Sequence, residues 1–301
     1  MTTLRGCGTA LVTPFQADGT VDVEALRKLV RWQVEEGIDF LVPCGSTGEA
    51  ATLTPAERET VVRTVVEEAR GQVPVMAGAT HNDTRQAVEE ARRMSSLGVT
   101  WLLSATPYYN KPTPEGIIRH FSAIADASTV PVCLYNIPGR TGVNMRTDTV
   151  LRLAQHPNII GIKESSGDLA QVQHLLLARG PGFSVLSGED WMTLAILAAG
   201  GDGLVSVASN EIPKLMAQLV RRSLRGQVEE AREILYQVLP LLEANFLETN
   251  PAPVKAALAA MGKIGNHLRL PLVPLSESRL PPLLAALREA GVELAGEMVH
   301  S

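Results

Sequence analysis

Eight short apolar runs alternate with longer segments of helical periodicity, and this alternation limits the folds open to the chain. The runs start roughly 20 to 35 residues apart, about the length of one strand–helix unit. Strands buried on both faces give such continuous apolar runs, which are typical of parallel sheets. Eight strands close into a (β/α)8 barrel, so we predict an α/β TIM-barrel fold, with an open doubly wound sheet as the alternative. The predicted strands are Gly8–Val12, Phe40–Cys44, Val73–Gly78, Trp101–Ala105, Val130–Tyr135, Ile159–Lys163, Phe183–Leu186 and Gly203–Val207.

Capping sequences support the helical segments between these runs. Thr54 with Glu57 three residues later forms a capping box, and Pro55 stands at the first helical position. Asp83 followed by Gln86 repeats this pattern before the next helix. Both patterns predict a helix directly after the cap.

The eighth strand–helix unit ends near Gly226, and the rest of the chain contains no further strand pattern. Helical periodicity over about 228–242, 253–261 and 278–290 predicts a small C-terminal helical extension. Because no low-complexity linker precedes it, we expect this extension to pack on the barrel. The predicted organisation is therefore a (β/α)8 barrel catalytic domain, residues 1–226, followed by a C-terminal helical region, residues 227–301.

Composition excludes several classes of protein. The chain has 27 basic and 32 acidic residues, a formal net charge of −5, whereas nucleic-acid binders usually show a basic surplus. The longest apolar run, residues 191–199, is well short of the roughly 20 residues that a membrane-spanning helix needs. The first residues lack the apolar stretch of a secretory signal, so we expect a cytoplasmic protein that binds neither nucleic acid nor membrane.

The sequence predicts neither a metal site nor an organic cofactor. Cys7, Cys44 and Cys133 lie in apolar runs without CxxC spacing, so we expect reduced core residues. The six histidines show no HxH or HExxH spacing, and the GxGxxG, Walker and GxSxG patterns are absent.

Lys163 is the most informative single residue. Active sites of such barrels lie at the C-terminal ends of the strands, and Lys163 ends the sixth run. An ammonium ion in an apolar strand is costly to bury, which favours the neutral amine. Such an amine can form a Schiff base with a carbonyl substrate. A buried ion pair with Glu164 is the alternative, but neighbouring side chains of a strand point to opposite faces.

Other strand ends carry groups that suit an anionic substrate. Ser46 and Thr47 lie in the small-residue turn after the second strand, where hydroxyl and backbone N–H groups can hold a carboxylate. Tyr135 ends the fifth strand and can relay protons, and Arg140 in the next loop can bind a carboxylate with two hydrogen bonds. Taken singly, each of these residues also fits an ordinary structural position.

Two further loops bear on the substrate. Tyr108 and Tyr109 are adjacent in the loop after the fourth strand, which suits an active-site loop or a subunit interface. The turns at 187–190 and 200–203 belong to the seventh and eighth units, where many barrels bind phosphate. They carry acids and no Lys or Arg, which disfavours phosphorylated substrates and pyridoxal phosphate.

With these residues placed, the chain resembles the dihydrodipicolinate synthase and N-acetylneuraminate lyase superfamily of class I aldolases over essentially its whole length. Several ordered motifs matching together are more specific than any one alone. The matching motifs are Gly45–Glu49, Pro107–Asn110, Tyr135–Pro138 with Arg140–Gly142, Gly161–Glu164, Leu186–Gly188 and Asn250–Lys255.

The resemblance implies how the motifs would act. Lys163 would form the Schiff base with pyruvate, and Ser46 and Thr47 would contact the pyruvate end. Tyr135 would relay protons above the imine, linked through Ser46 to Tyr109 from a neighbouring subunit. The superfamily's tetramers imply a homotetramer, a dimer of dimers.

The second substrate depends on Arg140. In the synthases of this superfamily an arginine in this loop binds the carboxylate of L-aspartate 4-semialdehyde, and the sialic acid lyases lack it. Its presence favours condensation of pyruvate with that semialdehyde to 4-hydroxy-tetrahydrodipicolinate, the first step of the diaminopimelate and lysine branch, without a cofactor. Gly188 and the main chain of Val205 match further pocket positions.

Ser46 departs from the synthase pattern. The synthases usually have two threonines here, and Gly-Ser-Thr-Gly-Glu is the form familiar from the lyases. Another pyruvate-dependent aldolase, such as N-acetylneuraminate lyase or a keto-deoxy sugar acid aldolase, is therefore an alternative. A catalytically silent keto-acid-binding barrel is a further alternative from a different functional class.

The lysine-feedback pocket of some bacterial synthases is matched only in part. Asn82 and Tyr108 fit its pattern. Losing the glutamate of that pattern removes the partner for a ligand ammonium, so the resemblance predicts weak or absent inhibition by lysine. The departures are Ala50, Pro55, Arg58 and Gln86, which stand where the pattern has serine, two histidines and glutamate.

Overall fold

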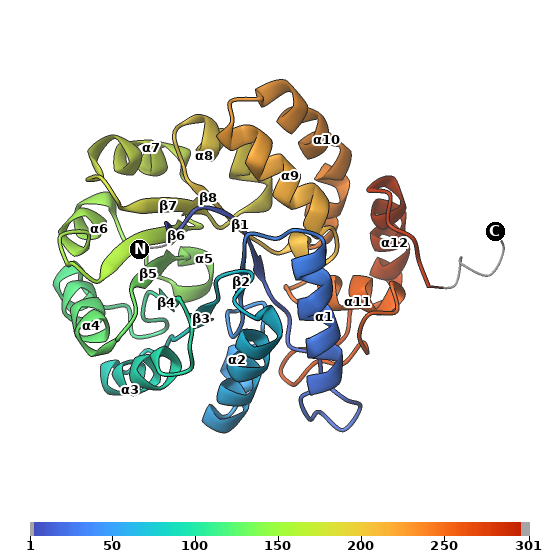
Figure 1. Ribbon diagram of the computed structural model, residues 1–301, viewed down its shortest axis with the longest axis horizontal. Helices are drawn as coiled ribbons and strands as arrows, with labels where there is room; N and C mark the ends of the chain where they lie inside the picture. Colours follow the sequence, from blue (N-terminus) through green and yellow to red (C-terminus); the bar gives the residue numbers. More distant parts are fainter. Residues whose placement is uncertain (1–2, 296–301) are drawn as a thin grey trace.

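The computed structural model describes residues 3–295 and contains the eight expected strands in one parallel sheet (Figure 1). Neighbouring strands follow the order β2-β1-β8-β7-β6-β5-β4-β3. A parallel bridge between Leu41 and Val75 joins the two ends, so the sheet closes. This confirms the TIM barrel and excludes the open sheet. The strands are β1 Gly6–Ala10, β2 Phe40–Val42, β3 Met76–Gly78, β4 Trp101–Ala105, β5 Val132–Asn136, β6 Ile159–Glu164, β7 Ser184–Ser187 and β8 Gly203–Ser206.

Several predicted strand ends were wrong, and two have a clear physical reason. β2 stops at Val42 because Pro43 has no N–H to donate and Cys44 has a φ of 57°, in the left-handed region. β5 begins at Val132 rather than Val130 because Pro131 likewise lacks a donor. Apolar composition marks the position of a strand, whereas hydrogen-bonding capacity decides where it ends.

Helices follow the strands around the barrel (Figure 1). The predicted capping box is confirmed: Thr54 Oγ1 accepts from Glu57 N at 3.3 Å, and the Glu57 carboxylate accepts from Thr54 N at 2.8 Å. The Asp83 carboxylate caps the next helix. The helices are α1 Val23–Glu35, α2 Pro55–Ala69, α3 Thr84–Ser95, α4 Pro114–Ala127, α5 Pro138–Thr141, α6 Thr147–Leu153, α7 Leu169–Ala178, α8 Thr193–Ala198, α9 Pro213–Leu224, α10 Val228–Ala244, α11 Ala252–Ala260 and α12 Leu280–Glu289, with short 3-10 helices η1 Ala50–Thr52, η2 Asp190–Met192, η3 Ala208–Asn210 and η4 Glu277–Arg279.

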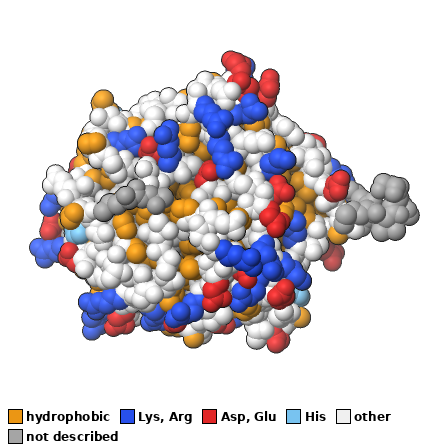
Figure 2. All heavy atoms as spheres, in the orientation of Figure 1, with side chains coloured by type: hydrophobic (Ala, Val, Ile, Leu, Met, Phe, Trp, Pro, Cys, Tyr) orange, Lys and Arg blue, Asp and Glu red, His pale blue; other side chains and the backbone are white. Residues whose placement is uncertain are grey.

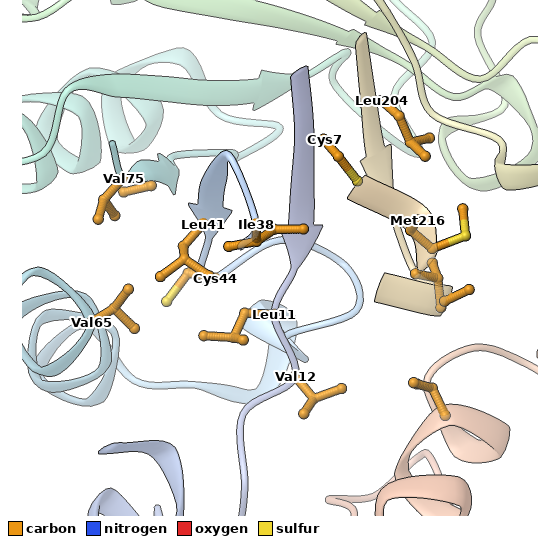
Figure 3. Packing of buried hydrophobic residues seen from close by; sticks show 14 of the residues in the cluster. Cys7, Leu11, Val12, Ile38, Leu41, Cys44, Val65, Val75, Leu204 and Met216 are labelled. Atoms are coloured by element: carbon orange, nitrogen blue, oxygen red, sulfur yellow. The ribbon is translucent and has the colours of Figure 1, made fainter. Parts of the chain in front are cut away.

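Alternation along the strands divides the apolar core into two layers. Phe40, Trp101 and Tyr135 belong to the smaller cluster, which fills the barrel. The larger cluster lies between strands and helices, where Figure 3 shows Cys7 beside Leu204 of β8. All three cysteines are free and buried, as expected, and burial raises the pKa of both the Cys44 and Cys133 thiols to about 12.

The C-terminal helices pack against the barrel helices and against one another. α10 contacts α9 and α12, and α12 contacts α11 (Figure 1). The Lys263 ammonium lies 3.6 Å from the ring centroid of Trp32 on α1. None of the helices between residues 3 and 295 is long and apolar enough to cross a membrane. On the face shown in Figure 2, basic side chains lie among acidic ones.

Candidate active site

Lys163 and Tyr135 lie side by side inside the barrel. They are opposite each other in the β5–β6 pairing, so both side chains leave the sheet on the same face. The Lys163 ammonium nitrogen is 4.2 Å from the centroid of the Tyr135 ring, and both residues are buried. An amine and a phenol therefore meet at the C-terminal ends of two adjacent strands, as the sequence predicts.

Glu164 points away from this pair. Its carboxylate accepts hydrogen bonds from Asn136 Nδ2 at 3.1 Å and from Ser166 N at 2.7 Å. Burial raises the pKa of the Glu164 carboxyl. Because these partners satisfy Glu164 outside the barrel, it does not form the alternative ion pair with Lys163.

A cavity of about 230 Å³ opens beside Tyr135. Ser46 reaches it from the loop after β2, and Arg140 reaches it from α5, which follows β5 directly. Lys163 is not part of the cavity wall and adjoins it through Tyr135. A hydroxyl, a phenol and a guanidinium thus face one space, which suits a substrate that carries carboxylate groups.

Thr47 is held by a residue far along the chain. Its side chain is buried, and Thr47 Oγ1 accepts a hydrogen bond from Asn250 Nδ2 at 2.9 Å. The main-chain oxygen of Asn250 accepts from Arg140 Nη2 at 3.1 Å. Sequence reasoning assigned no role to Asn250, and the only signal for it was its place in the Asn250–Lys255 motif.

Gly188 and Val205 are buried or half-buried positions on the strands and turns near the lysine. A Cβ atom at Gly188 would lie 1.9 Å from Ser165 Oγ and 2.8 Å from Lys163 Cε, so only glycine fits beside Lys163. Val205 is fully buried in the interior cluster with Tyr135. Gly188 therefore lies directly against Lys163, and Val205 belongs to the same buried cluster as Tyr135.

Tyr109 is not brought into the cavity. Its side chain is 88% exposed, and its φ of 72° turns the loop outward, with Tyr109 N donating to Thr141 O at 3.3 Å. The neighbouring Tyr108 does line the cavity. Of the predicted site residues, Ser46, Tyr135 and Arg140 line the cavity, whereas Thr47, Lys163, Gly188, Val205 and Tyr109 do not.

Two carboxyl groups that follow β7 modify the electrostatics of the site. Burial raises the pKa of Glu189 to about 7, although the positive charge of Lys163 opposes the shift. Burial also raises the pKa of Asp190, whose carboxylate accepts from Val207 N at 3.1 Å and Ala208 N at 3.0 Å. Sequence reasoning used these acids only to argue against phosphate. Nothing in their local pattern indicates that Glu189 adjoins the lysine.

The described residues offer no cluster of three or more His, Cys, Asp or Glu side chains arranged to hold a metal ion. The groups that meet at the strand ends are an amine, a phenol, hydroxyls and a guanidinium. Groups of these kinds can act as a nucleophile, relay protons and bind carboxylates.

Comparison with known proteins identifies the family. The model of the dihydrodipicolinate synthetase family matches residues 3–290. The chain belongs to this family. A 4-hydroxy-tetrahydrodipicolinate synthase of Koribacter versatilis is 53% identical over 290 residues, covering 96% of this chain and 97% of that protein.

Solved structures of the dihydrodipicolinate synthetase family share the fold. The chloride-inhibited dihydrodipicolinate synthase from Acinetobacter baumannii, complexed with pyruvate, superimposes with a TM-score of 0.95 at 41% identity, covering 97% of this chain and all of that one. A monomeric dihydrodipicolinate synthase variant gives a TM-score of 0.94 at 42% identity, covering 96% of this chain and 97% of that one.

Proposed function

We propose that the chain condenses pyruvate with L-aspartate 4-semialdehyde to give 4-hydroxy-tetrahydrodipicolinate, the entry step of the diaminopimelate and lysine branch, in the cytoplasm. The observation that carries the proposal is the position of Arg140 on the same cavity as Ser46 and Tyr135, next to a buried lysine. A guanidinium there can hold the carboxylate of the second substrate. Two relatives that are 53% identical to this chain are named 4-hydroxy-tetrahydrodipicolinate synthase.

The chemistry follows from the residues present. Lys163 Nζ adds to the ketone of pyruvate, and loss of water gives the protonated imine. Tyr135 relays a proton from the methyl carbon, and the resulting enamine carbon attacks the aldehyde, whose oxygen gains a proton. The amine of the semialdehyde then attacks the imine carbon, which closes the ring and releases Lys163. The protonated imine is the electron sink, so no cofactor is needed.

The remaining site residues take supporting roles in the proposal. Ser46 and Thr47 bind the pyruvate carboxylate, and Ser46 also links Tyr135 to Tyr109 of a neighbouring subunit. Gly188 and the main chain of Val205 shape the wall. Residues 1–226 act as the catalytic barrel, followed by the helical region 227–301, which packs on the barrel up to residue 295; residues 1–2 and 296–301 lie outside the described residues.

Pyruvate consumption by the purified protein tests the proposal. L-Aspartate 4-semialdehyde, N-acetylmannosamine and simple aldehydes are compared as partners, with the Lys163→Ala variant as the blank. We expect consumption with the semialdehyde alone. Turnover with N-acetylmannosamine instead would overturn the substrate assignment and favour the lyase alternative that Ser46 suggests.

We also expect weak or absent inhibition by lysine. Arg58 donates from Nε and Nη2 to Ala50 O at 3.1 and 2.7 Å, and from Nη1 to Glu90 Oε1 at 3.3 Å. The guanidinium lines the same cavity as Tyr108, where it would repel a ligand ammonium. An inhibition curve for lysine checks this, and half-inhibition at low-millimolar lysine would contradict it.

The protein is expected to work as a homotetramer, a dimer of dimers. Tyr109 is almost fully exposed in one chain, as are Leu177 on α7 and, to a lesser degree, Tyr236 on α10. Large exposed apolar side chains are common at subunit interfaces. Sedimentation at working concentration measures the assembly. A monomer with full activity would refute the role of Tyr109.

A further inference from the structure

One residue of the C-terminal region contacts two of the proposed binding residues. The Asn250 side chain donates to Thr47 Oγ1 at 2.9 Å, and the Asn250 main-chain oxygen accepts from Arg140 Nη2 at 3.1 Å. In the proposed reaction, Thr47 serves pyruvate and Arg140 serves the semialdehyde. Asn250 therefore contacts one binding residue for each substrate.

The chain around Asn250 is fixed to the same loop that carries Thr47. Lys255 on α11 is fully buried and pairs with Glu49, which lies two residues after Thr47. The Lys255 ammonium also donates to His267 O at 2.8 Å. A buried ion pair is stable only when its geometry and further hydrogen bonds compensate for the lost hydration. The loop after β2 and the start of α11 are thus joined at two points, Thr47–Asn250 and Glu49–Lys255.

The direction of the Asn250–Thr47 hydrogen bond has a chemical consequence. A hydroxyl has one proton to donate. Because the amide of Asn250 donates to Thr47 Oγ1, the Thr47 proton is not used in this contact. It can be donated to an acceptor in the site, and a pyruvate carboxylate is such an acceptor.

We propose that Asn250 is a positioning residue for both substrates. Its side chain directs the Thr47 hydroxyl towards the pyruvate carboxylate, and its main-chain oxygen orients Arg140 for the carboxylate of the semialdehyde. The inference rests on the proposed function. It also gives the C-terminal helical region a part in substrate binding, although it supplies no reacting group.

Replacing the side chain separates the two contacts. In Asn250→Ala the main-chain oxygen remains for Arg140, whereas Thr47 loses its donor. We expect the KM for pyruvate to rise roughly tenfold, the usual effect of one lost buried hydrogen bond, with the KM for the semialdehyde changed less than about twofold. The Asn250→Asp variant is nearly equal in size, but its carboxylate can only accept a hydrogen bond. The Thr47 hydroxyl would then donate to Asp instead of to pyruvate, so the KM for pyruvate should rise further.

A double-mutant cycle shows whether Asn250 acts through Thr47. In a Thr47→Val background, Asn250→Ala should not raise the KM for pyruvate further, because no hydroxyl remains to be oriented. The matched control is Asn245→Ala, which removes a buried asparagine amide bonded to Glu211 Oε2 at 2.7 Å outside the cavity. It should lower the melting temperature and leave the KM for pyruvate unchanged.

Direct titration of the wild type and both Asn250 variants with pyruvate, followed by borohydride trapping, tests the positioning role of Asn250 separately from the proposed function. If the wild type binds pyruvate and Asn250→Ala and Asn250→Asp bind it equally well, the positioning role is wrong and the proposed function stands. Fully additive effects of Asn250→Ala and Thr47→Val would also overturn the positioning role. If the wild type itself does not bind pyruvate, the proposed function fails and the inference fails with it.

Discussion

Lys163→Ala is expected to abolish condensation. The Lys163 ammonium nitrogen lies 4.2 Å from the centroid of the Tyr135 ring, and the proposed reaction has no route to the enamine without it. Loss of a covalent nucleophile costs roughly ten-thousand-fold or more in turnover. Borohydride reduction in the presence of pyruvate measures the step directly, because it fixes the imine as a stable secondary amine. Mass spectrometry should show the adduct on wild type and none on the variant.

Lys263→Ala provides the control for this experiment. Lys263 is a half-buried lysine that lies on the Trp32 ring, away from the cavity. Its removal should leave trapping and turnover unchanged. A pyruvate adduct that persisted in Lys163→Ala, on any other lysine, would place the Schiff base elsewhere. Persistence of tight pyruvate binding without any adduct would instead favour a keto-acid-binding barrel.

The fold was predictable because its signals are local. Apolar runs buried on both faces mark the strands, and the cap at Thr54 marks a helix start, so the order of elements can be read from the chain. Lys163 was predictable for the same reason, since a lysine stands out in an apolar strand. The pairing of Lys163 with Tyr135 then follows from strands that are neighbours in the barrel.

The rest of the site could not be predicted from local pattern. The hydrogen bond from Asn250 to Thr47 spans 203 positions and depends on how α11 packs against the loop after β2. The pKa of Glu189 is set by burial that only the closed barrel produces. Tyr109 is a different case, because the site that it is proposed to complete belongs to another chain.

Arg140→Ala is expected to separate the two substrates. The proposed role of Arg140 is to bind the carboxylate of the semialdehyde, so its loss should reduce kcat/KM for that substrate. Two charge-assisted hydrogen bonds lost together cost about 3–4 kcal/mol, roughly a hundred- to thousand-fold. Pyruvate binding and borohydride trapping should change little, because Lys163, Tyr135 and Ser46 remain. Steady-state kinetics with each substrate varied in turn measures the difference.

In Arg140→Ala, kcat/KM should fall for the semialdehyde and not for pyruvate. A general structural effect would lower both values, so the comparison distinguishes the two. Among residues 3–295, the Arg140 side chain makes one hydrogen bond, to the main-chain oxygen of Asn250, so Arg140→Ala removes a single side-chain contact within the protein. Arg146→Ala removes an exposed arginine of the same segment outside the cavity and should behave like wild type. If Arg140→Ala kept its turnover of the semialdehyde, the guanidinium would be an ordinary loop charge. A keto-acid aldolase with a different aldehyde would then be the better reading of the same Schiff-base site.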